Sequence, residues 1–167
     1  MRNLTPQRKA TVLLVQDHPL VRQNLVRFIN LEADLMVCGE ASSSREGAAA
    51  AARLKPDLAI IGLALGNESG LWLIGLLRDT VPDMPVLVLS MHEEDLFALP
   101  ALKAGARGFM MLQDAAEELP SAIRDVLAGG IYLSSPLRQR FWKEPRPKRG
   151  VSAGQAGGQG GTGRPVA

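Results

Sequence analysis

The feature that most constrains the fold is an apolar run near the middle of the chain. Residues 58–63 are apolar throughout except for Gly62, and they lie between Pro56-Asp57 and a loop that contains glycine and asparagine. A short continuous run bounded by turn residues predicts a strand that is buried on both faces. Such strands form the centre of parallel sheets, where ligands bind at the carboxyl ends of the strands. The residue at that end here is Gly62, which has no side chain to offer.

Further apolar runs alternate with segments of helical period along the chain. The predicted strands are Thr11 to Val15, Leu35 to Glu40, Pro56 to Leu63, Pro85 to Ser90 and Gly108 to Leu112. The predicted helices run from about Pro19 to Ile29, Ser42 to Leu54, Ser69 to Asp79, Glu93 to Ala104 and Asp114 to Ala128. Strands that alternate with helices indicate an α/β fold, in which a parallel sheet is wound on both faces through right-handed crossovers.

Composition divides the chain into a body and a tail. From Leu137 onward there are seven Lys and Arg residues and one acid, Glu144, whereas the preceding part has 12 basic and 16 acidic residues. From Gly150 to the end, seven of 18 residues are glycine. We therefore expect an N-terminal extension over residues 1–10, a domain over 11–135, and a disordered tail over 136–167 that is first basic and then rich in glycine.

The chain shows no sign of secretion or membrane insertion. Its one cysteine, Cys38, lies in an apolar strand-like run, so it cannot form a disulfide within the chain and is expected to be a small buried hydrophobe. The N-terminus lacks the apolar core of a signal peptide, and no window approaches the ~18 apolar residues of a membrane span. We expect a cytoplasmic protein with no membrane contact.

Six short stretches stand out when they are taken together. They are Val15 to Arg22 (VQDHPLVR), Gly39 to Ser42 (GEAS), Pro56-Asp57, Ser69 to Leu71 (SGL), Val88 to His92 (VLSMH) and Ala101 to Phe109 (ALKAGARGF). In this order they resemble the receiver domain of bacterial response regulators, and most of all the receivers that precede a LuxR-type helix-turn-helix. The resemblance covers about residues 11–135.

The resemblance implies both a fold and a chemistry. The fold is a flavodoxin-like (βα)5 sheet of strand order 2-1-3-4-5. The chemistry is transfer of a phosphoryl group from a histidine kinase to an aspartate that ends the third strand. An acid pair after the first strand holds Mg²⁺, a Ser or Thr ends the fourth strand, and a Lys ends the fifth.

The chain departs from this pattern at the chemically important positions. The acceptor position is occupied by Gly62, the acid pair by Gln16 and Asp17, the Ser or Thr position by Ser90 and the lysine position by Leu112. Receivers also have an aromatic switch residue, and the matching residue here is Phe109. A phosphoryl acceptor must supply a nucleophilic oxygen, and the transfer needs metal and cationic groups to neutralise developing charge. We therefore expect a pocket that is only a remnant: no catalysis, no cofactor, and no metal, with Asp17 the one remaining ligand.

Three other assignments stay open from the residues alone. Glu68, in the loop after the third strand, or Ser90 could act as a non-standard acceptor, whereas Asp57 begins the strand and faces the wrong edge. His18 and His92 could form a transition-metal site with Asp17. The basic run RQRFWKEPRPKR could contact nucleic-acid phosphates, although the chain after residue 135 has no room for a helix-turn-helix.

The resemblance also implies a surface for partners. In receivers, the fourth helix, fifth strand and fifth helix form the usual partner or dimer surface. Pro100 and Pro120 lie inside these two helices, where an interior proline costs about 3 kcal/mol, so they either reshape this surface or reflect sequence drift. Trp72 is predicted to point outward from the third helix, where it could anchor a partner.

The resulting hypothesis is a stand-alone pseudo-receiver of two-component signalling that acts through protein contact without phosphorylation. Its expected partners are a histidine kinase, another response regulator or a second copy of the chain, and DNA binding is not expected.

Overall fold

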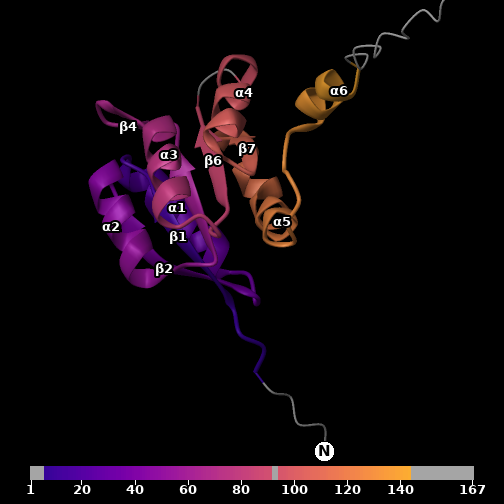
Figure 1. Ribbon diagram of the computed structural model, residues 1–167. Helices are drawn as coiled ribbons and strands as arrows, with labels where there is room; N and C mark the ends of the chain where they lie inside the picture. The colour runs from indigo at the N-terminus through magenta and orange to yellow at the C-terminus, as the bar shows by residue number, and fades with distance from the viewer. Residues whose placement is uncertain (1–5, 92–93, 144–167) are drawn as a thin grey trace, which may run out of the picture.

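The computed structural model describes residues 6–91 and 94–143, which form a parallel sheet between two layers of helices (Figure 1). The strands of the sheet are β1 (Ala10–Val15), β2 (Leu35–Ala41), β3 (Leu58–Gly62), β6 (Val86–Ser90) and β7 (Gly108–Met111). They lie in the order β2-β1-β3-β6-β7, and every pair is parallel. Counted along the chain this order is 2-1-3-4-5, so the predicted flavodoxin-like α/β fold is confirmed.

The helices cover the two faces of the sheet unequally. Helices α1 (Pro19–Asn30) and α5 (Ala115–Leu127) pack on one face, and α2 (Ser44–Leu54), α3 (Gly70–Thr80) and α4 (Glu94–Ala104) pack on the other. Successive side chains of a strand point to opposite faces, so each strand contributes to both cores. In β3, Leu58 and Ile60 pack against the α1 and α5 layer, whereas Ala59 and Ile61 pack against the other layer.

Several local expectations are met. Helix α1 begins at Pro19, with His18 at its N-cap, as the Pro-containing first turn predicted. Trp72 of α3 is 60% exposed, which agrees with its position on the helical wheel. Cys38 in β2 departs from its expectation, because it is only half-buried where a buried hydrophobe was predicted; this partial burial raises the pKa of its thiol. No helix in the described part of the chain is long and apolar enough to cross a membrane.

Helices α4 and α5 each contain the interior proline that was noted in the sequence. Both helices continue through it, with Pro100 exposed in α4 and Pro120 half-buried in α5. Whether these prolines reshape the surface stays a prediction.

The carboxyl edge of the sheet differs from the predicted one. The segment after β3, expected to be a loop, forms an antiparallel hairpin of β4 (Ala64–Leu65) and β5 (Glu68–Ser69) around Gly66-Asn67. Gly66 has a φ of 62°, which glycine adopts without strain at the first position of a tight hairpin turn. Strand β7 ends at Met111, and Leu112 begins a 3₁₀ turn, η1 (Leu112–Asp114), instead of ending the strand.

The C-terminal part also differs from the prediction. The chain continues beyond residue 135 as α6 (Ser135–Lys143), whereas composition predicted a disordered tail from 136. The physical reason is Leu137, which is buried in the core on the α2, α3 and α4 face although it stands in a polar, basic segment. Residues 144–167, where the remainder of the predicted tail falls, lie outside the described residues.

Candidate functional site

Parallel register brings four of the predicted site residues to one edge of the sheet. Val15 pairs with Ile61 and Gly62 pairs with Leu89, so Gln16 lies beside Gly62 and Ser90 follows on the next strand. Ser90 in turn pairs with Met111, which places Leu112 at the same edge. The spatial grouping that the resemblance implied is therefore present, and it consists of an amide, a glycine, a hydroxyl and an apolar side chain.

The space between these residues is small. The cavity has a volume of about 20 Å³. It is lined by Gln16, Gly62, Leu63, Ala64, Leu89, Ser90, Met91 and Leu112. A volume of this size holds about one water molecule.

The Gln16 side chain lies against Gly62. A Cβ added to Gly62 would be 3.2 Å from both the Oε1 and the Nε2 atoms of Gln16. Gln16 is buried, and its Oε1 accepts a hydrogen bond of 3.0 Å from the Asp17 backbone N–H. The backbone carbonyl of Gln16 accepts a hydrogen bond of 2.6 Å from the Arg22 guanidinium. The Nε atom of Arg22 also forms an ion pair with Glu40 at 3.4 Å. A side chain at position 62 would therefore press on the Gln16 amide, which would have to shift by a few tenths of an ångström.

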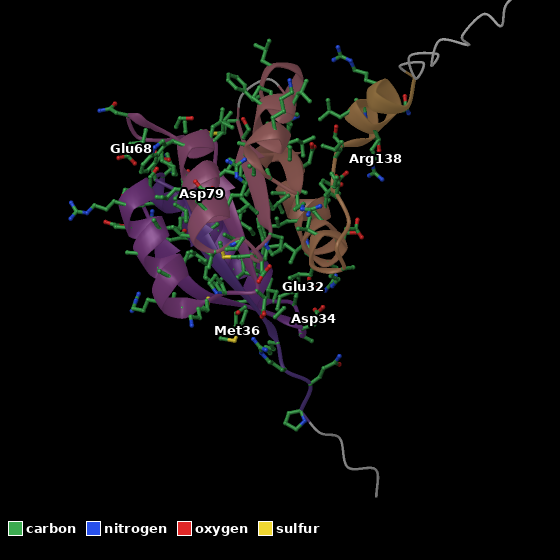
Figure 2. All side chains as sticks on the ribbon, viewed as in Figure 1. Glu32, Asp34, Met36, Glu68, Asp79 and Arg138 are labelled. Atoms are coloured by element: carbon green, nitrogen blue, oxygen red, sulfur yellow. The ribbon has the colours of Figure 1, made fainter. Side chains whose placement is uncertain are left out.

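The two acids nearest to this edge bind backbone groups. Asp17 Oδ2 accepts a 2.9 Å hydrogen bond from the Gly66 N–H at the tip of the hairpin. Glu68, which Figure 2 shows on the same hairpin, accepts a 3.1 Å bond from the Ser44 N–H in the first turn of α2. A carboxylate at a helix N-terminus is favoured by the helix dipole. Glu68 is therefore held at α2 and does not point into the pocket.

Gly70 closes the base of the hairpin. Its N–H donates a 2.7 Å hydrogen bond to the Leu63 carbonyl, and a Cβ at this position would lie 2.2 Å from the Gly62 carbonyl oxygen. This close approach of two backbone segments requires glycine. The hairpin consequently sits directly over the end of β3.

The remaining predicted residues have separate positions. Phe109 is fully buried, and Leu112 packs at the margin of the core on the α1 and α5 face. His18 caps α1, with its Nδ1 3.5 Å from the Val21 N–H, and His92 lies outside the described residues. Within residues 6–91 and 94–143, no group of three or more His, Cys, Asp or Glu side chains is placed to hold a metal ion.

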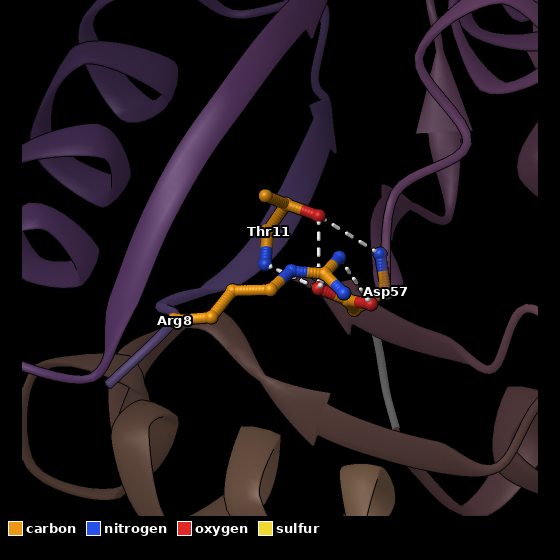
Figure 3. Close-up of polar contacts among 3 residues, drawn as sticks. All are labelled: Arg8, Thr11 and Asp57. Atoms are coloured by element: carbon orange, nitrogen blue, oxygen red, sulfur yellow. Dashed lines mark hydrogen bonds and ion pairs between the residues drawn. The ribbon is translucent and has the colours of Figure 1, made fainter. Parts of the chain in front are cut away.

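Asp57 lies at the opposite, amino-terminal edge, as its place in the sequence predicted. Figure 3 shows its carboxylate between Thr11 and Arg8. The Oδ2 atom accepts bonds of 2.8 Å from the Thr11 N–H and 3.0 Å from the Thr11 hydroxyl, and Arg8 lies at 3.3 Å. The hydrogen bond from the Thr11 backbone, more than the Arg8 charge, lowers the pKa of Asp57 below its ordinary value.

Comparison with known proteins agrees with this architecture. Residues 12–124 match the response regulator receiver domain. The chain belongs to the response regulator receiver family. It is 35% identical over 136 residues to the nitrate/nitrite response regulator protein NarL of Escherichia coli, an alignment that covers 80% of this chain and 62% of NarL. The chain thus spans less than two thirds of the length of that relative.

Solved structures show the same similarity. A two-component response regulator of the LuxR family from Aurantimonas has a TM-score of 0.76 at 30% identity, over 81% of this chain and 97% of that chain. The signal receiver domain of a response regulator, NarL, from Mycobacterium tuberculosis has a TM-score of 0.69 at 28% identity, over 73% of this chain and 98% of that chain. Receiver domains are signalling modules of two-component systems and generally not enzymes, and they interact with kinases or other proteins.

Sequence reasoning missed the residues that organise this edge by local contacts. Arg22 and Gly70 lie in the stretches that carry the resemblance, but no local role was predicted for them or for Gly66, which bonds Asp17. A Gly-Asn pair flanked by short segments is a recognised hairpin signal and could have predicted the hairpin. Nothing in the sequence indicated that the Arg22 guanidinium would reach the Gln16 carbonyl.

Proposed function

We propose that this receiver is a pseudo-receiver, which acts in two-component signalling by protein contact without being phosphorylated. The observation that carries the proposal is the amide of Gln16 lying against Gly62 at the phosphoacceptor position. No carboxylate stands there, and a Cβ at position 62 would lie 3.2 Å from both polar atoms of the Gln16 amide, so a side chain there would require this amide to shift by a few tenths of an ångström. The pocket contains neither an anionic nucleophile nor a cationic partner at Leu112, so it has lost several mutually dependent groups together.

The partner surface that we propose consists of α4, β7 and α5. In its favour, Leu96 of α4 is 62% exposed and Leu99 is also exposed, so this helix presents apolar side chains to solvent. Isolated exposed leucines are common, but two that are three residues apart lie on one face of a helix and form a contact stripe. A histidine kinase or another response regulator is the class of partner that we propose.

Incubation with acetyl phosphate and Mg²⁺ tests the chemical part of the proposal. We expect no phosphoryl incorporation, and no Mg²⁺-dependent change in tryptophan fluorescence on addition of beryllofluoride, because no acceptor and no metal site are available. A receiver with an aspartate at the end of its third strand serves as the positive control. A stable acyl-phosphate adduct on any carboxylate of this chain would overturn the proposal.

The contact part is tested with purified histidine kinases and response regulators from the same genome, without any phosphate donor. Leu96→Ser with Leu99→Ser should abolish binding to the partner that wild type binds. Leu31→Ser, which removes an exposed leucine at the end of α1, is the matched control and should bind normally. Equal binding by all three proteins would exclude the α4 surface.

A further inference from the structure

The chain after α5 returns to the sheet and pairs with its edge. Tyr132 forms a parallel bridge with Gly108 of β7. The Tyr132 N–H donates a 2.9 Å bond to the Arg107 carbonyl, and the Phe109 N–H donates a 3.0 Å bond to the Tyr132 carbonyl. We refer to residues 131–138 as the strap. Because β7 is the last strand of the sheet, the strap satisfies edge groups that a partner strand could otherwise bind.

The strap also covers apolar surface beside the edge. Leu133 and Leu137 are buried, with 8% and 4% of their surface exposed. They belong to the same cluster as Phe109 of β7 and Ala98 and Ala101 of α4. The strap thus adds two leucines to the core on the α2, α3 and α4 face, where Phe109 is fully buried.

Polar contacts hold the strap at a few points only. Two contacts are internal to the strap: Arg138 Nε donates a 2.8 Å bond to the Leu133 carbonyl, and its guanidinium carbon lies 5.8 Å from the centroid of the Tyr132 ring. The Tyr132 hydroxyl donates a hydrogen bond to Glu118 of α5. Figure 2 shows Arg138 on the side of the molecule where the chain passes from α5 to α6. The strap is thus held to the rest of the domain by its backbone bonds to β7 and by the side-chain bond to α5.

The connection to α5 is suited to movement of the strap as a unit. Helix α5 ends at Leu127, and the next residues include Gly129, with a φ of 91°, and Gly130, both exposed. Two adjacent glycines give the backbone more conformational freedom than any other pair. The strap can therefore leave the edge without requiring α5 to unfold.

We propose that the strap is an intramolecular occupant of a docking groove between α4 and the edge of β7, and that a protein partner binds there by displacing it. The partner segment would share the chemistry of the strap: an extended residue that bonds to β7, followed by two apolar side chains four residues apart that cover Phe109. This proposal rests on the proposed function for the existence of a partner. The opening of the strap itself can be measured without one.

Amide hydrogen exchange in the full chain tests whether the strap opens as a unit. Leu137→Ser removes a buried anchor, and Ile131→Ser, at a position 57% exposed in the same segment, is the matched control. We expect exchange at the Phe109 and Tyr132 amides to become at least ~10-fold faster in Leu137→Ser and to stay unchanged in Ile131→Ser. The Ile60 amide in the sheet should exchange at the wild-type rate in both. Equal acceleration at Ile60 would show that the strap belongs to the cooperative core and would overturn the proposal.

A peptide with the sequence of residues 131–143 tests the groove directly. We expect it to bind Leu137→Ser at least ~10-fold more tightly than wild type, because in wild type the strap competes at high effective concentration. Tyr132→Phe, which removes only the hydrogen bond from the strap to Glu118 of α5, should bind the peptide with an affinity between those of wild type and Leu137→Ser, and it provides a folded variant if Leu137→Ser is unstable. Equal binding to wild type and to both variants, or binding to none, would overturn the proposal. Phosphorylation of the chain would refute the proposed function and leave these two measurements unaffected.

Discussion

The two edges of the sheet differ in the charge of the side chains that lie there. At the amino-terminal edge, Asp57 is bound by Thr11 and Arg8, and Arg124 pairs with Glu32 and Asp34. The hydrogen bond from Arg124 lowers the pKa of Asp34, so this edge holds its carboxylates in the charged form. At the carboxyl edge, where receivers do their chemistry, the pocket is lined by an amide, a glycine, a serine hydroxyl and apolar side chains.

The difference between the edges corresponds to the hydrogen-bond donors that the fold supplies to each carboxylate. Three acids near the edges have specific donors: Asp57 has the Thr11 amide and hydroxyl, Asp17 has the Gly66 N–H, and Glu68 has the Ser44 N–H. A buried carboxylate without a metal or cation is costly, because it loses hydration that nothing replaces. A neutral Gln16 beside Gly62 and Leu112 avoids this cost. Carboxylates thus lie where the fold supplies hydrogen-bond donors to them. The pocket, where a metal ion would have to stabilise a carboxylate, is lined by neutral side chains.

The largest expected effect comes from converting the carboxyl edge back to a charged one. Gln16→Asp, Gly62→Asp and Leu112→Lys together should allow phosphoryl incorporation from acetyl phosphate. We expect Gly62→Asp alone to incorporate about 100-fold less, because it lacks the cation and one acid and because its new side chain meets the Gln16 amide.

The informative control is the double variant Gln16→Asp with Gly62→Asp, which removes the steric conflict and restores the acids but not the lysine. We expect its phosphoryl incorporation to lie between that of Gly62→Asp alone and that of the triple variant. If Gly62→Asp alone matched the triple variant, only the nucleophile was missing and the pocket was not remodelled.

A second effect concerns the backbone at the same edge. In Gly70→Ala the new Cβ would lie 2.2 Å from the Gly62 carbonyl oxygen, so backbone must move. We expect a loss of about 3 kcal/mol or more in the free energy of unfolding, measured by urea denaturation. Gly75→Ala in α3, where nothing lies within 4 Å of the added Cβ, should instead stabilise the protein by about 0.5–1 kcal/mol. Similar losses in both variants would contradict the close approach at Gly70.

These contacts mark the limit of what the sequence predicts. The fold was predictable because hydrophobic runs and helical periods extend over many residues, whereas the site positions Gln16, Gly62, Ser90 and Leu112 were predicted from the resemblance to receivers. The hairpin was missed although its Gly-Asn pair is a local signal, whereas α6 was missed because it depends on a few tertiary contacts. Leu137 in particular is one apolar residue in a basic segment, and its burial depends on a core that distant segments assemble.

A third, smaller effect tests the charged edge through pH. The folded-state pKa of Asp57 is lowered, so its contribution to stability is present above the ordinary pKa of about 4 and is lost as pH falls through the lower folded value. Asp57→Asn should cost about 1–2 kcal/mol at neutral pH and should flatten the loss of stability on acidification. The measurement is urea denaturation at a series of pH values. The control is Asp79→Asn, a substitution at an exposed position of α3. A difference between Asp57→Asn and wild type that stays constant from neutral pH to below the carboxyl range would contradict this role.

The smallest effect distinguishes a structural Asp17 from a metal ligand. Its Oδ2 atom accepts one hydrogen bond from Gly66, so Asp17→Ala should cost about 0.5–1.5 kcal/mol, whereas Asp17→Asn keeps an acceptor oxygen and should cost less. The Gly66 amide should exchange faster in Asp17→Ala than in Asp17→Asn. Millimolar Mg²⁺ should leave the thermal midpoint of wild type and both variants unchanged, because one carboxylate beside a neutral amide is a poor magnesium site. If Mg²⁺ stabilised wild type and lost this effect equally in Asp17→Asn and Asp17→Ala, Asp17 would be acting as a metal ligand, and the contrast between the two edges would fail at its most direct point.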